Sequence, residues 1–151
     1  MLLETLRLLT VFLAGLLAGE ELVIRYGVCG PVAGLEEHAQ IRLRQALIRR
    51  LRILVPIVLF AVVPSGVAVV ILGGIDRRET FAGIGVACLI AFLAITLGGT
   101  VPIDQATLTW DPAAPPRDWR QLVRRWERLD TARTWAALAA FLCFLLSLAG
   151  F

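Results

Sequence analysis

Long apolar runs separated by short charged segments form the main pattern of this chain. Four runs are apolar over enough residues to cross a membrane, and they cover about 2–26, 53–72, 80–99 and 131–150. A helix needs roughly 20 mainly apolar residues to cross a hydrocarbon core, and inside lipid a helix satisfies its own backbone hydrogen bonds. We therefore predict an all-α integral membrane protein, built as a four-helix bundle in a single domain.

The first apolar run has a second interpretation, as a secretory signal peptide, because the small residues over 14–19 resemble a cleavage region. Glu4 beside Arg7 makes its start unlike a basic leader. Cleavage would also export the Arg-rich segment that follows, against the positive-inside tendency. The pattern therefore favours a retained membrane helix.

The segment 35–52 combines a helical apolar pattern with many Arg residues. We predict an extra amphipathic helix here, between the first and second spans, lying on anionic lipid headgroups at the cytoplasmic surface. Nucleic-acid binding is the weaker interpretation, because no aromatic side chains are interleaved with the charges. We expect the lipid bilayer to be the partner of this helix, and no nucleic acid.

The segment 101–134 holds three of the four Trp residues and ends in the clearest helix start of the chain. Asp118 followed by Gln121 fits a capping box. The helical pattern then continues to about residue 148, roughly 45 Å at 1.5 Å per residue, which exceeds a hydrocarbon core of about 30 Å. Residues 118–130 should therefore project from the membrane.

Small residues recur at helical spacing in two of the spans. Gly15 and Gly19 form a GxxxG pair, and Gly83, Ala87, Ala91 and Ala94 form a stripe. Such faces let helices approach closely in lipid, so we expect them to pack within the bundle; they are also compatible with a homo-oligomer.

Composition adds the orientation of the protein in its membrane. Hydrophobic residues make up 58% of the chain, and all fifteen basic residues are Arg. Most of the Arg residues lie between spans one and two or between spans three and four. The positive-inside rule then predicts cytoplasmic Arg-rich loops and two outward-facing termini, with the plasma (inner) membrane as the expected location. A single His and three Cys without CxxC spacing predict no metal site.

Acidic, Arg and aromatic residues gather where the spans meet the Arg-rich side. The candidates for a site there are Glu21, Arg25, Tyr26, Asp104, Trp119, Trp126, Asp130 and Arg133. One interpretation is an interfacial aromatic belt with side chains that extend to water. The other is a polar pocket at the mouth of the bundle, since ionisable residues at membrane depth usually face a cavity or a partner.

Several segments resemble one family of membrane proteins. They are GEELVIRYGV, RQALIRRLRILVP and the spaced series VPID, DW, RRWERLD and RT, which together extend over nearly the whole chain. This pattern resembles the anthrone-oxygenase-like integral membrane family. The resemblance implies a four-helix bundle and, for the characterised fungal branch, oxidation of an anthrone to an anthraquinone by molecular oxygen, with no established metal or organic cofactor.

Two positions depart from the family's pattern, which often has Asn at position 104 and His at position 130, where this chain has Asp104 and Asp130. If the protein is an oxygenase, Asp130 or Glu21 would remove a proton from an acidic C–H, and Arg25 or Arg133 would stabilise the enolate. Tyr26, Asp104, Trp119 and Trp126 would bind a hydrophobic polycyclic substrate. The alternative is a non-enzymatic bundle that serves as a partner subunit or a small-molecule binder or carrier.

Overall fold

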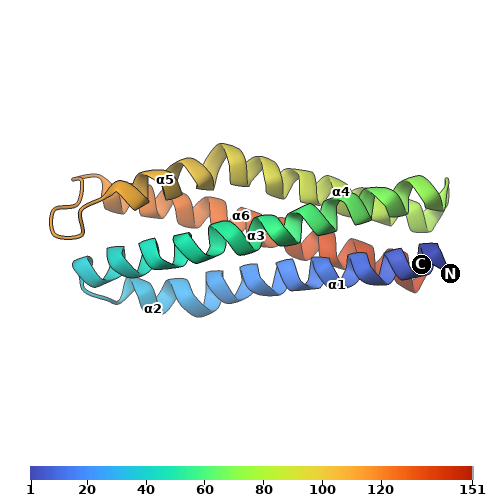
Figure 1. Ribbon diagram of the computed structural model, residues 1–151, viewed down its shortest axis with the longest axis horizontal. Helices are drawn as coiled ribbons and strands as arrows, with labels where there is room; N and C mark the ends of the chain where they lie inside the picture. Colours follow the sequence, from blue (N-terminus) through green and yellow to red (C-terminus); the bar gives the residue numbers. More distant parts are fainter. Residues whose placement is uncertain (151) are drawn as a thin grey trace.

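Four long helical rods form the protein, and each runs antiparallel to the rod before it (Figure 1). The computed structural model describes residues 1–150. The first rod joins α1 (Leu2–Leu22), the π-helical η1 (Val23–Val28) and α2 (Cys29–Ala33), and the second is α3 (Glu37–Gly73). The third joins α4 (Arg77–Ile95), the π-helical η2 (Thr96–Thr100) and α5 (Val101–Thr109), and the fourth is α6 (Trp119–Ala149). Each rod is long and apolar enough to cross a membrane, which confirms the predicted all-α membrane bundle.

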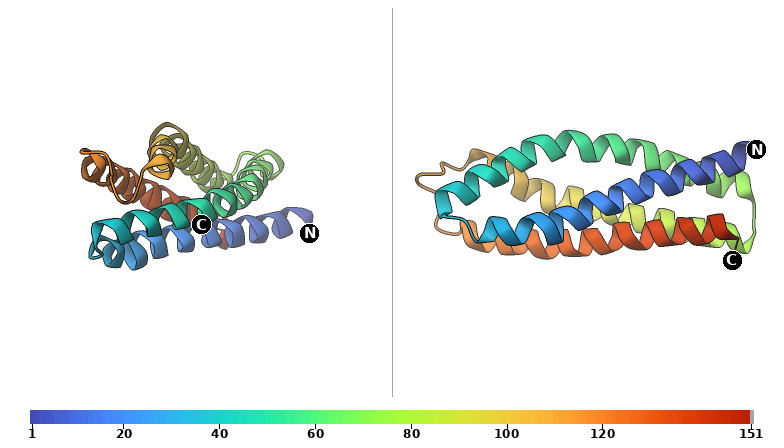
Figure 2. Two further views of the ribbon diagram at one scale, coloured as in Figure 1. Left: turned by 60° about the vertical axis from the view of Figure 1, so that its left-hand side comes forward. Right: turned by 90° about the horizontal axis from the view of Figure 1, so that it is seen from below.

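The two ends of the bundle differ in what they carry. The N-terminus, the last described residues and the α3–α4 turn lie at one end, which we call the terminal end (Figure 1). The α2–α3 and α5–α6 connections lie at the other, which we call the mouth end. Figure 2 shows that α6 runs beside α1, while α3 arches along the opposite side. The polar residues singled out from the sequence therefore belong to the mouth half of the bundle.

The separate amphipathic helix predicted over 35–52 is wrong. These residues form the first part of α3, which continues without interruption from Glu37 to Gly73. The Gln45 amide donates hydrogen bonds to the carbonyls of Thr107 and Trp110, both at 2.9 Å. These contacts hold the segment along the bundle axis, against the end of α5. Nothing in the sequence of the segment breaks the helix before the apolar span begins.

Two helices continue beyond the ends of their apolar runs at about residues 26 and 99, through Gly27, Gly30 and Pro31 and through Gly98, Gly99 and Pro102. Proline cannot donate to the carbonyl of the preceding turn. In each rod a π-helical turn lies just before the proline and absorbs the break in register. Asp118 does precede α6 as predicted, but its side chain makes no capping hydrogen bond; instead its backbone carbonyl accepts from the Gln121 amide at 2.9 Å.

Aromatic side chains of α6 fit against glycines of the neighbouring helices. A Cβ atom on Gly85 of α4 would lie 3.0 Å from the Phe144 ring, and one on Gly66 of α3 would lie 2.9 Å from it. Gly15 of α1 meets the ring of Phe141 in the same way, at 3.1 Å. Glycine is required here because it lets three helix backbones approach rings that are held in the core.

The predicted small-residue faces are only partly used. Gly19 and Gly83 have no neighbouring atom within 4 Å of a built Cβ, and Ala87, Ala91 and Ala94 are exposed on the outside of the bundle. The stripe on α4 is therefore not its packing face within the bundle. Helix α4 packs instead through the buried residues Ala82, Gly85, Leu89 and Phe92.

A buried ion pair joins two rods near the terminal end. Arg7 of α1 bonds to Glu79 at the start of α4, and it also contacts Glu4 at 2.6 Å. Both Arg7 and Glu79 are buried. Outside the polar groups of the mouth half, this pair is the main charged link between rods in the described structure, and the core between the two charged levels is apolar.

Gly85→Ala should lower the thermal stability of the purified protein. The new methyl group would overpack the Phe144 site, at a cost of about 1–3 kcal/mol, although alanine is the better helix former. Gly83→Ala, on the same helix but facing open space, is the matched control and should leave the melting temperature unchanged or raised. Equal melting temperatures for both variants, measured in one detergent, would contradict this account of the packing.

Candidate functional site

A buried guanidinium group connects three of the four rods. Arg133 of α6 contacts Glu21 of α1 through two nitrogens, Nε to Oε2 at 3.0 Å and Nη2 to Oε1 at 2.9 Å. Its Nη2 also lies 3.2 Å from Oδ1 of Asp130, and its Nη1 lies 3.5 Å from the Thr100 hydroxyl of η2. All four side chains are buried. Such a two-point contact fixes the guanidinium plane as well as its position.

An aromatic ring completes the surroundings of this cation. The Phe92 ring of α4 has its centroid 5.2 Å from Cζ of Arg133, a distance at which the ring face attracts a cation. We call Glu21, Thr100, Asp130 and Arg133 the core cluster. Its members are separated by up to 112 positions in the sequence, so only the folded bundle creates it.

The core cluster has more acidic groups than its single cation neutralises. Within the described residues, Oδ2 of Asp130 and both carboxylate oxygens of neighbouring Glu20 lack a hydrogen-bond partner. Nε of Arg25, one turn on from Glu21, is also buried without a partner. Ionisable groups at membrane depth are costly and commonly mark ligand or proton sites, so this excess of unpaired groups is a functional signal.

Both π-helical turns of the molecule adjoin the core cluster. The turn η1 begins directly after Glu21 and Leu22 and carries Arg25 and Tyr26, while η2 contains Thr100. A π-turn widens the helix and redirects its side chains, and such turns occur frequently at functional sites. Here η2 carries the Thr100 hydroxyl that faces Arg133.

A cavity of about 660 Å³ lies between α3 and the α4–η2–α5 rod. We call it the lateral cavity, and residues of all four rods line it: Ile24, Ile48, Leu51, Arg52, Val55, Pro56, Leu59, Phe60, Val63, Pro64, Leu93, Thr96, Leu97, Val101, Asp104, Gln105, Leu108, Trp126 and Arg133. Phe60 and Leu97 are also 82% and 61% exposed on the outer surface. The cavity therefore opens sideways, toward the region that lipid chains occupy.

The two prolines inside α3 are both part of this wall. Pro56 and Pro64 line the lateral cavity, and each removes a helical hydrogen bond to the carbonyl four residues earlier. Bends at proline are the usual cause of a curved helix, and α3 arches in the view from below (Figure 2). The prolines thus account for the space between α3 and its neighbour.

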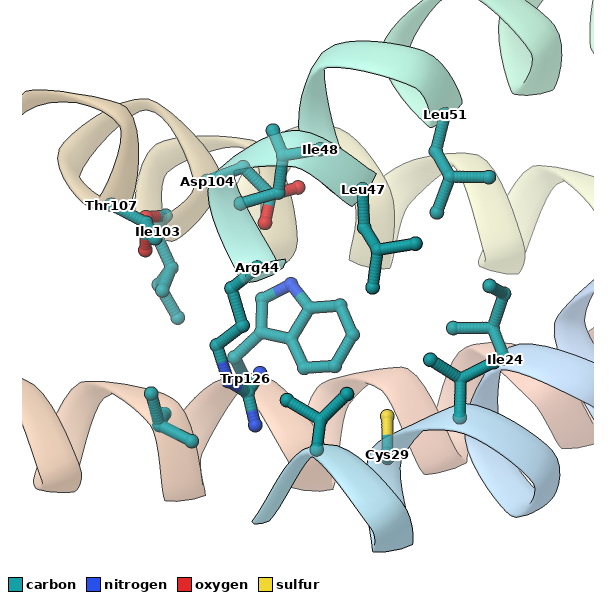
Figure 3. Close-up of a pocket in the computed structure, with 13 residues that line it drawn as sticks. Ile24, Cys29, Arg44, Leu47, Ile48, Leu51, Ile103, Asp104, Thr107 and Trp126 are labelled. Carbon is teal, nitrogen blue, oxygen red and sulfur yellow. The ribbon is translucent and has the colours of Figure 1, made fainter. Parts of the chain in front are cut away.

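A second, smaller pocket of about 50 Å³ continues the lateral cavity toward the mouth end. We call it the inner pocket; it has room for a few molecules the size of water. Ile24, Ile48, Leu51, Asp104 and Trp126 line both spaces. In Figure 3 the indole nitrogen of Trp126 is on the side of Asp104, and the Arg44 side chain runs alongside the ring. Asp104 and Trp126 are the polar residues of the boundary between the two spaces.

The predicted site residues separate into three groups in the structure. Glu21, Asp130 and Arg133 form the core cluster with Thr100, and Arg25 is half-buried beside them. Asp104 and Trp126 line the lateral cavity, which Arg133 also reaches. Tyr26 is 58% exposed, and Trp119 is buried in a separate cluster with Ile41, Trp110 and Val123. The structure therefore does not bring Tyr26 or Trp119 to the cavity.

Sequence reasoning missed several polar residues of this region. Thr96 and Thr100 lie in an apolar span with four-residue spacing, a signal that was available in the sequence. Arg44 was assigned to a lipid-facing helix, yet it is buried, bonds to Glu127 at 3.1 Å and lies 5.6 Å from the Trp126 ring centroid. Arg44 is buried because the first part of α3 runs along the bundle axis and not on the membrane surface.

Residues 1–150 contain no group of three or more His, Cys, Asp and Glu side chains placed to hold a metal ion. Apolar side chains form most of the lateral cavity wall. In polarity the cavity suits a mainly apolar molecule with a few polar atoms.

The model of the anthrone oxygenase family matches residues 45–143, about two thirds of the chain. The protein belongs to the anthrone oxygenase family. The match includes Asp104, Trp119, Trp126, Asp130 and Arg133, whereas Glu21, Arg25 and Tyr26 precede it. Comparisons with curated proteins and with solved structures gave no match. The matched part of this anthrone oxygenase family member thus holds every lining residue of the lateral cavity except Ile24, and it holds the cation of the core cluster.

Arg133→Gln should destabilise the bundle strongly, by about 3–5 kcal/mol, because it leaves buried carboxylates without their cation. Arg128→Gln, an exposed position on the same helix, should have little effect. The double variant Glu21→Gln/Arg133→Gln removes both partners and should recover part of the loss. Thermal unfolding of the wild type, Glu21→Gln, Arg133→Gln and the double variant in one detergent tests this cycle, and a loss in the double variant equal to the sum of the two single losses would contradict a direct pairing.

Proposed function

We propose that this protein is an oxygenase that oxidises a hydrophobic, anthrone-like polycyclic substrate with molecular oxygen, using no metal or organic cofactor. The observation that carries the proposal is the lateral cavity, which opens toward lipid and has Asp104 and Arg133 in its wall. Membership of the anthrone oxygenase family supports the same class of reaction.

The geometry favours Asp104 as the proton acceptor, in place of the Asp130 and Glu21 suggested from the sequence. An Asn at position 104, which is frequent in the family pattern, could not act as this base, so the assignment is particular to this chain. Asp104 lines both the lateral cavity and the inner pocket. Asp130 and Glu21 line neither space, and both are fully buried against Arg133. In this proposal they position the Arg133 guanidinium, which faces the cavity and stabilises negative charge on the substrate oxygen.

The reaction balances without a further reagent. Asp104 removes a proton from the CH₂ carbon opposite the ring ketone, and the resulting enolate transfers an electron to O₂. The radical pair combines to form a C–O bond and, after protonation, a hydroperoxide. Loss of the remaining C–H proton then breaks the O–O bond. One oxygen atom becomes the new carbonyl, and the other leaves as water with the two hydrogens of the former CH₂.

The apolar walls have two roles in this scheme. They provide apolar contacts for the rings in the part of the cavity beside Asp104, with the Trp126 indole available for stacking. They also keep bulk water away from the enolate, so that the charge of Arg133 acts in a medium of low polarity, where it is stronger.

Oxygen uptake by the detergent-solubilised protein with a simple anthrone tests this proposal. Uptake should exceed the spontaneous rate of the substrate, and Asp104→Asn should lower it by about 10²–10⁴-fold, the usual contribution of a positioned base. Asp111→Asn, in the exposed α5–α6 connection, is the control and should retain full turnover. Full activity in Asp104→Asn would refute the assignment of the base, and no uptake in the wild type would favour a non-enzymatic binder or carrier.

We also propose that the mouth end faces the cytoplasm of the plasma (inner) membrane and that both termini face outward. The support is the Arg content of the mouth end, where exposed residues such as Arg42, Arg49 and Arg50 would contact anionic headgroups.

Cysteine labelling in intact cells tests this orientation. In a variant without Cys29, Cys88 and Cys143, a new cysteine at Ile75 in the exposed α3–α4 turn should react with a membrane-impermeant maleimide. A cysteine at Ala113 in the α5–α6 connection should react only after the cells are opened. The reverse pattern would show the opposite topology.

A further inference from the structure

The lateral cavity is much longer than three fused rings. Its lining on α3 extends from Ile48 to Pro64, which at 1.5 Å per residue is about 24 Å. On the opposite rod it extends from Leu108 back to Leu93, a similar length. A compact tricyclic ketone would leave a large part of this space unfilled, and empty space in a protein interior is unfavourable.

The polar and apolar parts of the lining are at opposite ends. The contacts from Gln45 to Thr107 and Trp110 set the register of the antiparallel rods. In that register the polar lining residues fall in the half nearer the mouth: Arg52, Thr96, Asp104, Gln105, Trp126 and Arg133. Beyond them, toward the terminal end, the lining residues Leu59, Phe60, Val63, Pro64 and Leu93 are all apolar.

This apolar half has the direction and dimensions of a lipid chain. On α3 every lining residue from Val55 to Pro64 is apolar, and this part of the wall extends about 14 Å, nearly half of a hydrocarbon core of about 30 Å. It runs along the helix axes, as do the chains of surrounding lipids, and it opens to them beside Phe60 and Leu97.

We propose that the lateral cavity takes a ring compound that carries a long hydrocarbon chain, with the ring between Asp104 and Arg133 and the chain between α3 and α4. The proposal rests on the proposed function only in that the same residues hold the ring. The hydrocarbon chain determines how the ring is oriented, because the hydrocarbon chain can extend only toward the apolar terminal end of the cavity. The substrate class is thus a lipid-like aromatic ketone that never has to leave the membrane.

Photolabelling tests where the chain lies. The probe has a dihydroxynaphthalene ring, a decyl chain and a diazirine at the chain end, and the protein is held in lipid nanodiscs. Irradiation should label Leu59, Val63 and Leu93 in preference to Ile90 and Ile71, which face lipid outside the cavity. An excess of the ring compound without a chain should reduce this labelling.

A second probe, with the same chain and diazirine on a glycerol headgroup, separates ring recognition from simple lipid contact. It should label Ile90 and Ile71 at least as strongly as the cavity residues. If both probes give the same cavity labelling and the free ring does not compete, the cavity holds an ordinary lipid chain and the proposal is wrong.

Two variants of α4 provide the matched comparison. Leu93→Trp fills the apolar half and should reduce labelling of Val63 by about tenfold, which corresponds to about 1.4 kcal/mol. Ile90→Trp, on the exposed side of the same helix, should leave the labelling of Val63 unchanged. Val63→Phe, read out by labelling of Leu59, repeats the test if Leu93→Trp does not fold. Unchanged labelling in both cavity variants would overturn the proposal.

The readout is independent of turnover. Ring-dependent labelling of the apolar half in a protein that consumes no oxygen would support this inference and refute the oxygenase. Oxygen uptake without such labelling would support the oxygenase and refute the inference about the hydrocarbon chain.

Discussion

The contact between Arg133 and Glu21 is the interaction on which the mouth half of this bundle depends. A guanidinium group inside a membrane protein is stable only when carboxylates and hydrogen-bond acceptors surround it. Glu21 approaches it from α1, Asp130 from its own helix and Thr100 from η2. Meeting that requirement fixes the relative heights of three rods, while the Gln45 contacts to Thr107 and Trp110 set the height of α3 against them.

The position of the site depends on residues that usually break helices but do not end them in this protein. Prolines and glycines near the mouth end would normally end helices, yet two rods continue through them by means of π-helical turns. Those turns place Thr100 beside the cluster, while the two prolines of α3 bend that helix away from its neighbour. The polar cluster and the lateral cavity are therefore next to each other because the two π-helical turns lie in the mouth half and the bend of α3 begins at Pro56, level with η2.

This arrangement gives the two kinds of acidic residue different roles. Asp130 and Glu21 are enclosed and hold the cation, whereas Asp104 lies at the boundary of two spaces that a small molecule can occupy. An orienting shell behind a reacting group is the usual design of a preorganised site. Access from the side, between α3 and the α4–η2–α5 rod, suits a family whose substrates are expected to be poorly soluble in water.

The sequence by itself determined that the chain is a four-helix membrane protein, because apolar runs of spanning length leave a helix as the one local solution in lipid. It also singled out Glu21, Asp104, Trp126, Asp130 and Arg133, since charged and indole groups at membrane depth are rare, and these are the predicted residues that lie in the core cluster or the cavity wall. The apolar pattern did not decide where helices end. A proline or glycine ends a helix in water, but inside a bundle the loss of hydrogen bonds to solvent makes continuation through a π-turn more favourable.

Only the tertiary structure decided which of those residues meet. Whether a side chain faces lipid, a neighbour or a cavity depends on the rotation and height of each rod, and these are set by contacts between distant positions such as Gln45 with Thr107 and Phe144 with Gly66 and Gly85. Hence Trp119 and Trp126, on one face by spacing, pack in different places, and Tyr26 faces outward. Pairing across rods is a property of the packed bundle, and no local pattern contains it.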